Sequence, residues 1–250
     1  MANSQDPTTA ICGFDADSIL IRGKNLVEDV IGRYTLTGAF LLQALGKEPS
    51  ERQIELLDVV LVTIMEHGMV PSVVASRLTL HGAPESLQGA VAAGLLGVGD
   101  RYAGTAAQCG EVLAELIDSN DRDSAAADLV RRYRAEKRAV PGFGHPIHTG
   151  TDPRVEKLLS YVARDSQALQ AAESLEGALS EALGKPLVMN VSTALAILMF
   201  EIGIPVSAMR GVILISRCAG LVGHLLEEMN TPVGNDLWRS AEGSVTYQPN

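Results

Sequence analysis

The sequence PGFGHPIHTGTDPR occupies residues 141–154 and follows a stretch, residues 131–138, in which six of eight side chains are charged. The segment holds three prolines, three glycines and two of the five histidines of the chain. Proline restricts the backbone, while glycine permits positive φ or the close approach of a ligand, so this composition predicts a shaped loop. Functional residues favour loops held between rigid elements. The segment is therefore the first place to seek a site.

His145 lies inside this loop, between Gly144 and Pro146. An imidazole held there can donate a hydrogen bond to a carbonyl or hydroxyl oxygen, or act as an acid near neutral pH. It can equally tie the loop together. The residues alone leave both roles open.

Helical patterns surround the loop on both sides. In residues 51–66, apolar side chains recur every three or four positions from Ile54 to Ile64, after the start signal Pro49-Ser50. Further helices are predicted at residues 85–98, 123–137, 155–171, 173–183, 191–202 and 207–228. The best strand candidate is short, residues 19–22. Small residues in 85–98 favour close helix packing, and the predicted architecture is mainly α.

The composition limits the kinds of partner. The 250 residues are 46% hydrophobic, enough to bury a large core in one or two domains. Thirty acidic against twenty basic residues give a net charge of -10, so the overall field repels nucleic acid and anionic membranes. We expect no nucleic-acid and no membrane partner. An anionic ligand would need a local basic pocket.

Residues 1–10 are polar and contain no apolar run, so we expect a frayed tail without a secretory or transit signal. The most apolar stretch, residues 187–226, is interrupted by Glu201, Pro205 and Arg210 before it reaches the length of a membrane span. We therefore expect it to form two buried helices.

The three cysteines, Cys12, Cys109 and Cys218, lie far apart in the sequence. This spacing supports neither a disulfide framework nor a zinc site, and we predict no metal. A reducing compartment is the default for such a chain. We expect a cytoplasmic location.

The loop at residues 141–154 resembles the PGxGHxxxxxTDPR signature of the citrate synthase family. Three further segments resemble the same family: residues 15–46, its amino-terminal segment and following helix; Glu66 to Ser72, which contains a carboxylate-binding histidine; and ISRCAGLVGHLLEE, residues 215–228, its SRxxGxxxHxxE helix. Nearly the whole chain is covered by the resemblance.

Within that family the chain is similar to the short citryl-CoA lyases and to the citryl-CoA lyase module of ATP-citrate lyase. The distinguishing segment is GLLGVGDRYAGTAAQ, residues 94–108. Citrate synthases carry there the histidine of GPLHGG, which contacts the thioester carbonyl, whereas the lyase-type proteins read GDRFGG or similar. Tyr102 takes this position here, so the resemblance favours a lyase over a synthase.

The resemblance also implies a site for a small dicarboxylate, such as oxaloacetate or the citryl end of citryl-CoA. Planar guanidinium groups suit this task because each holds a carboxylate through two parallel hydrogen bonds. His145 is implied to polarise or deprotonate the C3 oxygen. The residues implied to bind substrate are His67, Arg154, Arg217 and Arg239, the last supplied across a dimer to the neighbouring site. Coenzyme A is implied to lie along Pro141, Gly142, Phe143 and Gly144.

One position departs from the family pattern. The catalytic aspartate of the family follows Asn-Val, but this sequence reads Asn190-Val191-Ser192. A serine hydroxyl without a neighbouring base cannot remove a carbon-bound proton at neutral pH. Tyr102 and Ser192 thus stand at two of the three catalytic positions of a synthase, and His145 remains as the third.

Three explanations of this departure stay open. A different acid can serve, and the polar candidates near matching segments are Asp100, His81 and His148. The enzyme can instead act on another 3-hydroxyacyl-CoA. The protein can also bind a ligand without converting it.

The sequence thus predicts an all-α, citrate synthase-like fold with a large and a small helical domain around a cleft. Residues 1–10 form the tail, residues 11–250 the module, and residues 105–200 the small domain inserted in the large one. The predicted activity is retro-aldol cleavage of citryl-CoA, or a related 3-hydroxyacyl-CoA, to acetyl-CoA and oxaloacetate. The alternative is a catalytically silent protein that binds a dicarboxylate or acyl-CoA. We expect a homodimer or higher oligomer with no tightly bound cofactor and a coenzyme A thioester as substrate.

Overall fold

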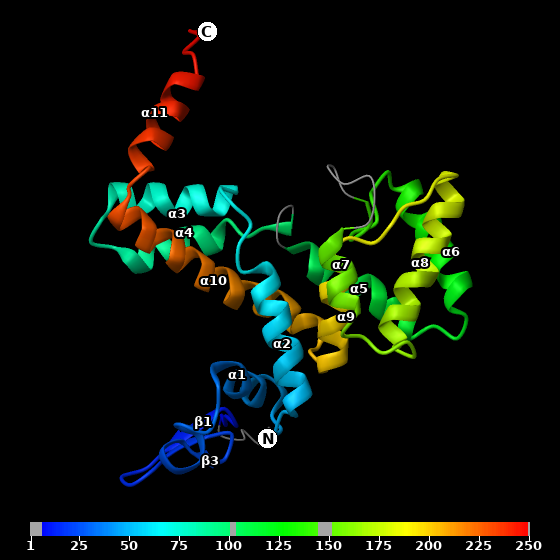
Figure 1. Ribbon diagram of the computed structural model, residues 1–250, viewed down its shortest axis with the longest axis horizontal. Helices are drawn as coiled ribbons and strands as arrows, with labels where there is room; N and C mark the ends of the chain where they lie inside the picture. Colours follow the sequence, from blue (N-terminus) through cyan, green and yellow to red (C-terminus); the bar gives the residue numbers. More distant parts are fainter. Residues whose placement is uncertain (1–6, 101–103, 145–151, 250) are drawn as a thin grey trace, which may run out of the picture.

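The computed structural model describes residues 7–100, 104–144 and 152–249 and is predominantly helical (Figure 1). The helices are α1 (Leu36–Leu45), α2 (Glu51–Ile64), α3 (Pro71–Gly82), α4 (Leu87–Leu96), α5 (Thr105–Ile117), α6 (Arg122–Ala135), α7 (Pro153–Leu159), α8 (Gln167–Leu183), α9 (Val191–Ile202), α10 (Val206–Asn230) and α11 (Gly234–Ser244). The predicted fold class is confirmed. The predicted tail falls partly on residues 1–6, which lie outside the described residues.

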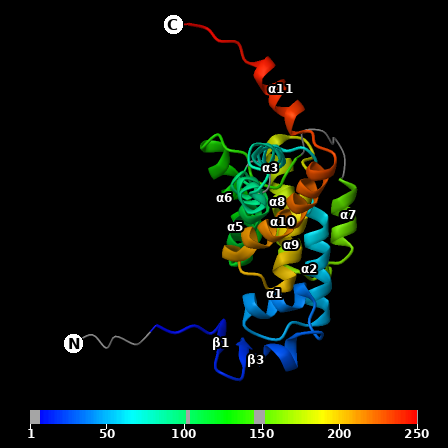
Figure 2. The same ribbon diagram turned by 90° about the vertical axis from the view of Figure 1, so that its left-hand side faces the viewer.

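A small antiparallel ribbon precedes the helices. Strand β2 (Ile19–Ile21) confirms the predicted strand and pairs with β1 (Cys12–Phe14) on one side and β3 (Lys24–Asn25) on the other. Asp15 closes the β1–β2 turn by accepting hydrogen bonds from the backbone N–H of Ser18, at 2.7 Å, and of Asp17. The ribbon and the π-helical segment η1 (Leu26–Val30) project from the helical body (Figures 1 and 2). Strands β1 and β3, of three and two residues, had no prediction because so short a segment carries little alternation.

Helix α2 begins where the sequence predicted and leads directly to the candidate site. Ser50 and Gln53 form a reciprocal capping box, in which each side chain accepts a hydrogen bond from the backbone N–H of the other. Leu57 and Val60 are fully buried and fix the inner face of the helix. The helix ends at Ile64, immediately before the segment that contains Glu66 and His67.

The predicted helix at residues 155–171 is wrong, because the chain forms two helices there. Helix α7 ends at Leu159 and α8 begins at Gln167. Ser166 caps α8 by accepting a hydrogen bond from the backbone N–H of Leu169 at 3.1 Å, and its hydroxyl donates to Glu201 at 2.7 Å. The apolar spacing continues across residues 155–171, but the cap at Ser166 starts a new helix there. Helices α3, α5 and α11 lacked a separate prediction.

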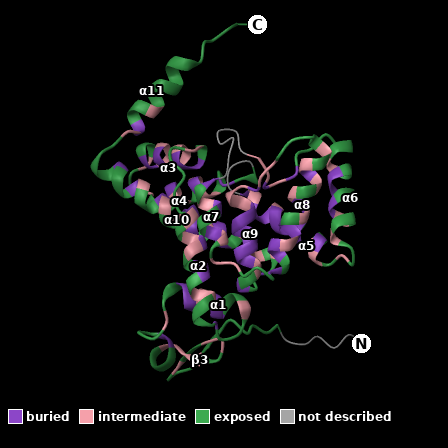
Figure 3. Cartoon of the chain, turned by 45° about the vertical axis from the view of Figure 1, so that its right-hand side comes forward, coloured by how far each residue is buried: buried purple, intermediate pink, exposed green. Residues whose placement is uncertain are grey.

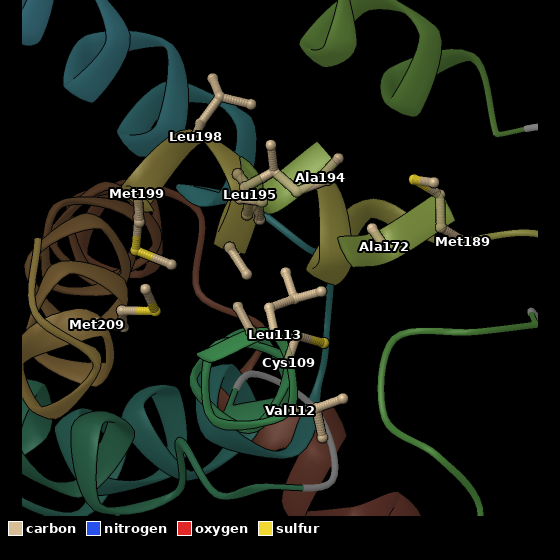
Figure 4. Packing of buried hydrophobic residues seen from close by; sticks show 14 of the residues in the cluster. Cys109, Val112, Leu113, Ala172, Met189, Ala194, Leu195, Leu198, Met199 and Met209 are labelled. Atoms are coloured by element: carbon tan, nitrogen blue, oxygen red, sulfur yellow. The ribbon is translucent and has the colours of Figure 1, made fainter. Parts of the chain in front are cut away.

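Helix α9 forms the centre of the core and confirms the predicted helix at residues 191–202. It packs against α2, α5, α7 and α8, and its buried surface extends around the helix (Figure 3). Leu198 and Met199 are fully buried. Met199 points toward Met209 of α10, and Leu113 of α5 lies to the right of Met209 in the same view (Figure 4). Ala194 and Leu195, near the start of α9, are also buried, so the end of the helix that meets the site is fixed by packing.

Helix α10 is long enough and apolar enough, by length and composition, to cross a membrane. It nevertheless packs against α2, α3, α4 and α5. A Cβ on Gly94 of α4 would lie 2.7 Å from the side chain of Leu221, so the small residue permits the close contact predicted for that segment. The buried side chains of Arg217 and Glu228 also point to protein surroundings. We interpret α10 as a helix of the protein interior, around which α2, α3, α4 and α5 pack.

The helices form two groups in Figure 1. Helices α5 to α9 gather on one side, α3, α4, α10 and α11 on the other, and α2 passes between them. The predicted small domain, residues 105–200, begins with α5 and ends within α9. The division into a large and a small domain stays a prediction.

The crossing of α2 and α10 predicts opposite effects for two glycines on one helix. A Cβ at Gly220 would overlap the carbonyl oxygen of Met65, whereas a Cβ at Gly223 has nothing within 4 Å. We expect Gly220→Ala to destabilise the protein by about 1–3 kcal/mol, because backbone atoms must shift. Gly223→Ala should stabilise it by about 0.5–1 kcal/mol through helix propensity. Urea unfolding of the two variants measures this, and equal effects would show that the crossing is not tightly packed.

Candidate active site

A small cavity of about 50 Å³ lies where α2, α5, α7, α9 and α10 meet. Its walls are formed by Thr63, Ile64, Glu66, His67, Ala106, Arg154, Val191, Ser192, Leu195 and Arg217. Four residues that the sequence singled out, His67, Arg154, Ser192 and Arg217, are thus brought together from four distant segments. Three of these four can carry positive charge in a chain whose net charge is -10.

Arg217 extends from the middle of α10 and is only 8% exposed. Burial lowers the pKa of its guanidinium, and the negative charge of Glu66 opposes this effect. An arginine remains charged at neutral pH even so. Among the residues that the structure describes, none accepts a hydrogen bond from this guanidinium. Its donors are therefore available to an anion in the cavity.

Arg154 is held at the cavity wall by its own neighbour in the sequence. Asp152 is the N-cap of α7 and accepts a hydrogen bond from the backbone N–H of Arg154 at 3.0 Å. The same carboxylate accepts hydrogen bonds from Nε, at 3.1 Å, and Nη2, at 2.7 Å, of the guanidinium. Hydrogen bonding to Asp152 raises the pKa of Arg154. Because Asp152 is 4% exposed, the cation has a fixed position rather than a flexible one.

His67 lies in the turn that follows α2, and its neighbour Glu66 stabilises that turn. One carboxylate oxygen of Glu66 accepts hydrogen bonds from the backbone N–H groups of His67 and Gly68, both at 2.7 Å. Glu66 also lines the cavity itself. From the sequence, Glu66 was named only as part of a motif. Its position directly before His67 was the one sign that it could belong to the site.

Ser192 is the second residue of α9. The side chain of Asn190 caps the helix by accepting a hydrogen bond from the backbone N–H of Ser192 at 2.9 Å. The cavity therefore meets the N-terminal end of a helix, where the backbone dipoles favour negative charge. Within the described part of the chain, no three His, Cys, Asp or Glu side chains gather as a metal site requires.

Residues Pro141 to Gly144 are bound to the segment that leads into α9. Gly144 donates its backbone N–H to Val188 at 2.9 Å, and Phe143 forms an isolated antiparallel bridge with Met189. The carbonyl of Gly142 accepts hydrogen bonds from the backbone N–H of Asn190 at 2.8 Å and from the hydroxyl of Thr193 at 2.7 Å. The loop therefore begins beside the cavity.

Gly142 has φ +85°, and a Cβ there would overlap the side chains of Thr193 and Cys109. Burial raises the pKa of the Cys109 thiol to about 12, so this sulfur is neutral and acts as a packing group. Position 142 thus requires glycine for two reasons: the positive φ, and the lack of space for a Cβ beside Thr193 and Cys109.

Two of the acids suggested by the sequence do not line this cavity. Asp100 forms an ion pair with Arg210, and both side chains are exposed. His81 lies in the last turn of α3, with its ring centroid 6.5 Å from that of Trp238. His145, Tyr102 and the third suggested acid, His148, lie outside the described residues.

Arg239 likewise does not line the cavity of its own chain. It lies on α11, and its guanidinium is 5.6 Å from the ring centroid of Trp238. Helix α11 packs against α3 and projects from the body (Figures 1 and 2). The predicted contribution of Arg239 to a neighbouring subunit stays a prediction.

The structure thus combines a helical body with a small cavity lined by two arginines and a histidine. Residues 20–241 match the family model described as citrate synthase, C-terminal domain. The chain belongs to the citrate synthase family.

Solved and curated proteins show what the chain is similar to. Citryl-CoA lyase from Hydrogenobacter thermophilus superimposes with a TM-score of 0.87 at 29% identity, over 98% of this chain and 96% of that one. ATP citrate lyase from Methanosaeta concilii gives a TM-score of 0.76 at 22% identity, over 100% of this chain and 43% of that one. Citrate synthase from Haloferax volcanii is 27% identical over 201 residues, 76% of this chain and 50% of that protein. The chain thus spans about half the length of that curated relative.

The guanidinium of Arg217, which has no hydrogen-bond acceptor among the described residues, predicts how a change to lysine affects ligand affinity. Arg217→Lys should weaken the affinity for oxaloacetate by roughly tenfold or more, since an ammonium cannot hold a carboxylate through two parallel hydrogen bonds. Arg132→Lys is the matched control, because Arg132 pairs with Glu115 and both are about half exposed. Isothermal titration calorimetry measures both. Equal affinities for wild type and Arg217→Lys would remove Arg217 from the site.

Proposed function

We propose that the chain is a carbon–carbon lyase of the citryl-CoA lyase type, which cleaves citryl-CoA or a related 3-hydroxyacyl-CoA to acetyl-CoA and oxaloacetate. The observation that carries this proposal is the buried, unpaired guanidinium of Arg217 beside Arg154 and His67. The citryl group bears two free carboxylates, which need fixed cations in a chain that is otherwise acidic. The likeness to citryl-CoA lyase over nearly the whole length of both chains supports the choice among family activities.

The cleavage is a retro-aldol step that balances without a cofactor. The C3 hydroxyl loses its proton, the C3–O bond becomes a carbonyl, and the adjacent C–C bond breaks. The bonding electrons pass to the thioester fragment as an enolate, which takes a proton on carbon to give acetyl-CoA. The remaining fragment is oxaloacetate, and its two carboxylates stay bound to the cations.

The residues of this chain divide these tasks. Arg154 and Arg217 orient the carboxylates, which places C3 at a defined point of the cavity. His145, by its match to the family motif, would take the proton of the C3 hydroxyl. The amino end of α9 and the hydroxyl of Ser192 can stabilise negative charge on an enolate oxygen. Ser192 does not supply the proton to carbon, so this step needs another group or solvent.

The second candidate is a silent member of the family that binds the same ligands, and Ser192 favours it. The serine stands at the wall of the cavity where the family motif places its catalytic aspartate. Bound dicarboxylate or acyl-CoA would then regulate the protein or a partner rather than be converted.

We also propose that the chain acts in the cytoplasm as a homodimer or higher oligomer. Helix α11 projects from its own body and presents Arg239 and the partly exposed Trp238 on that projection. A neighbouring subunit would receive these residues.

The direct test incubates the protein with citryl-CoA and a small panel of 3-hydroxy-3-carboxyacyl-CoA thioesters. Release of the shorter CoA ester is followed by mass spectrometry, with His145→Ala as the control. We expect turnover that disappears in the control. Absence of turnover, while the same ligands raise the melting temperature, would favour the silent binder.

Ser192→Asp separates the two candidates further. If the protein is a lyase adapted to serine, the new carboxylate should lower kcat, because it adds negative charge where an enolate develops. If it is a silent binder, the variant should gain citryl-CoA cleavage that wild type lacks. The ratio of the two rates decides between them.

A further inference from the structure

A chain of polar side chains runs from the cavity wall into the interface of α3 and α10. It begins at Glu66, whose Oε1 accepts the two backbone hydrogen bonds of the His67 turn. Its other oxygen, Oε2, lies 2.8 Å from Nε2 of His224 on α10. Nδ1 of His224 lies 2.8 Å from Nη2 of Arg77 on α3. Three elements are therefore linked behind the cavity.

The contacts assign the tautomer of His224. A guanidinium can only donate, so Nδ1 must accept the hydrogen bond from Arg77 and carries no proton. The imidazole proton then lies on Nε2, where Glu66 is the acceptor within reach. This tautomer places the ring N–H on the side of Glu66, whose Oε2 is 2.8 Å from Nε2.

The inner end of the chain is firmly anchored. Arg77 is 2% exposed and pairs with the buried Glu228 at 2.9 Å, and the exposed Glu227 contacts it from the solvent side. Glu228 also accepts hydrogen bonds from the backbone N–H of Val233, at 3.0 Å, and Gly234, at 2.7 Å. Arg77 therefore cannot easily move away from His224.

Glu66 is a poor proton donor in this setting. Partial burial raises its pKa, but hydrogen bonds from His224 and from the backbone of His67 and Gly68 outweigh burial, so the pKa lies below its usual value. Its carboxylate stays ionised at neutral pH, and both of its oxygens are occupied. Its role is thus to hold the turn and to face Arg217 with a fixed negative charge.

We propose that Glu66 and His224 are positioning residues, which fix the His67 turn against α10 and thereby set the geometry of the carboxylate site. This inference rests on the proposed function for its ligand, a dicarboxylate. Neither residue is required to transfer a proton. Removing the link should loosen the turn while the helices remain folded.

The test uses the full chain with three variants. His224→Phe removes both ring nitrogens, whereas His224→Gln keeps one acceptor for Arg77 and one donor for Glu66. Glu66→Gln keeps an acceptor for the turn but presents an N–H to the protonated Nε2 of His224. Glu55→Gln is the control, because Glu55 pairs with the half-exposed Arg52 on the same helix α2 as the turn.

Two readouts are needed, oxaloacetate affinity by calorimetry and hydrogen–deuterium exchange of the peptide that contains His67 and Gly68. We expect His224→Phe to weaken affinity about tenfold and to speed exchange in this peptide. His224→Gln should restore most of both. The double variant Glu66→Gln/His224→Phe should bind oxaloacetate no more weakly than the single variant with the lower affinity, because both substitutions break the same chain of contacts.

Unchanged exchange in both His224→Phe and Glu66→Gln would overturn the proposal, as would additive losses of affinity. The exchange readout needs no ligand. Failure of wild type to bind oxaloacetate would therefore count against the proposed function, while exchange still decides whether Glu66 and His224 position the turn.

Discussion

The close crossing of α2 and α10 is the constraint on which the site depends. Gly220 lets the carbonyl of Met65 approach the α10 backbone, and Ser216, one turn earlier, donates its hydroxyl to the carbonyl of Leu61. The end of α2 is thereby fixed one turn from Arg217. The turn with His67 follows at once, so a single helix crossing places both His67 and Arg217 at one cavity.

The electrostatic balance of the cavity explains how cations can be gathered in an acidic protein. Arg154 has a carboxylate partner in Asp152, whereas Arg217 has a hydrogen-bond acceptor nowhere in the described part of the chain and only the nearby charge of Glu66. Burying an unpaired guanidinium costs stability. Under the proposed function a ligand carboxylate would remove that cost, so its binding should stabilise the folded chain.

Much of the architecture could be predicted from the sequence, because long amphipathic helices carry a strong periodic signal. Helix α9 was predicted with its observed bounds, and α2 and α10 with ends displaced by only a few residues. The break between α7 and α8 was missed, since the cap at Ser166 is one residue within a continuous apolar pattern. Helix α4 was predicted, but its partner α3 was not, because the buried face of α3 includes Ser72, Ser76 and Arg77 and so forms no apolar stripe.

For the site, the motifs named His67, Arg154, Arg217 and Ser192, and the fold brings them to one cavity. Glu66 and His224 could not be assigned roles in advance, because those depend on a contact between α2 and α10 that no local pattern specifies. Asp100 and His81 were suggested from the sequence but do not line the cavity, because their positions also depend on contacts between distant helices. Sequence motifs identify groups that bind ligand better than the groups that hold them in place.

The central claim is that the arginines and the His67 turn form one carboxylate site around Ser192. A crystal structure of the full chain with oxaloacetate bound tests it most directly. We predict one carboxylate held by Arg217 and the other near Arg154, with the C2 carbonyl within reach of the start of α9. Oxaloacetate bound elsewhere, with the donors of Arg217 turned to solvent or to a protein acceptor, would contradict the account.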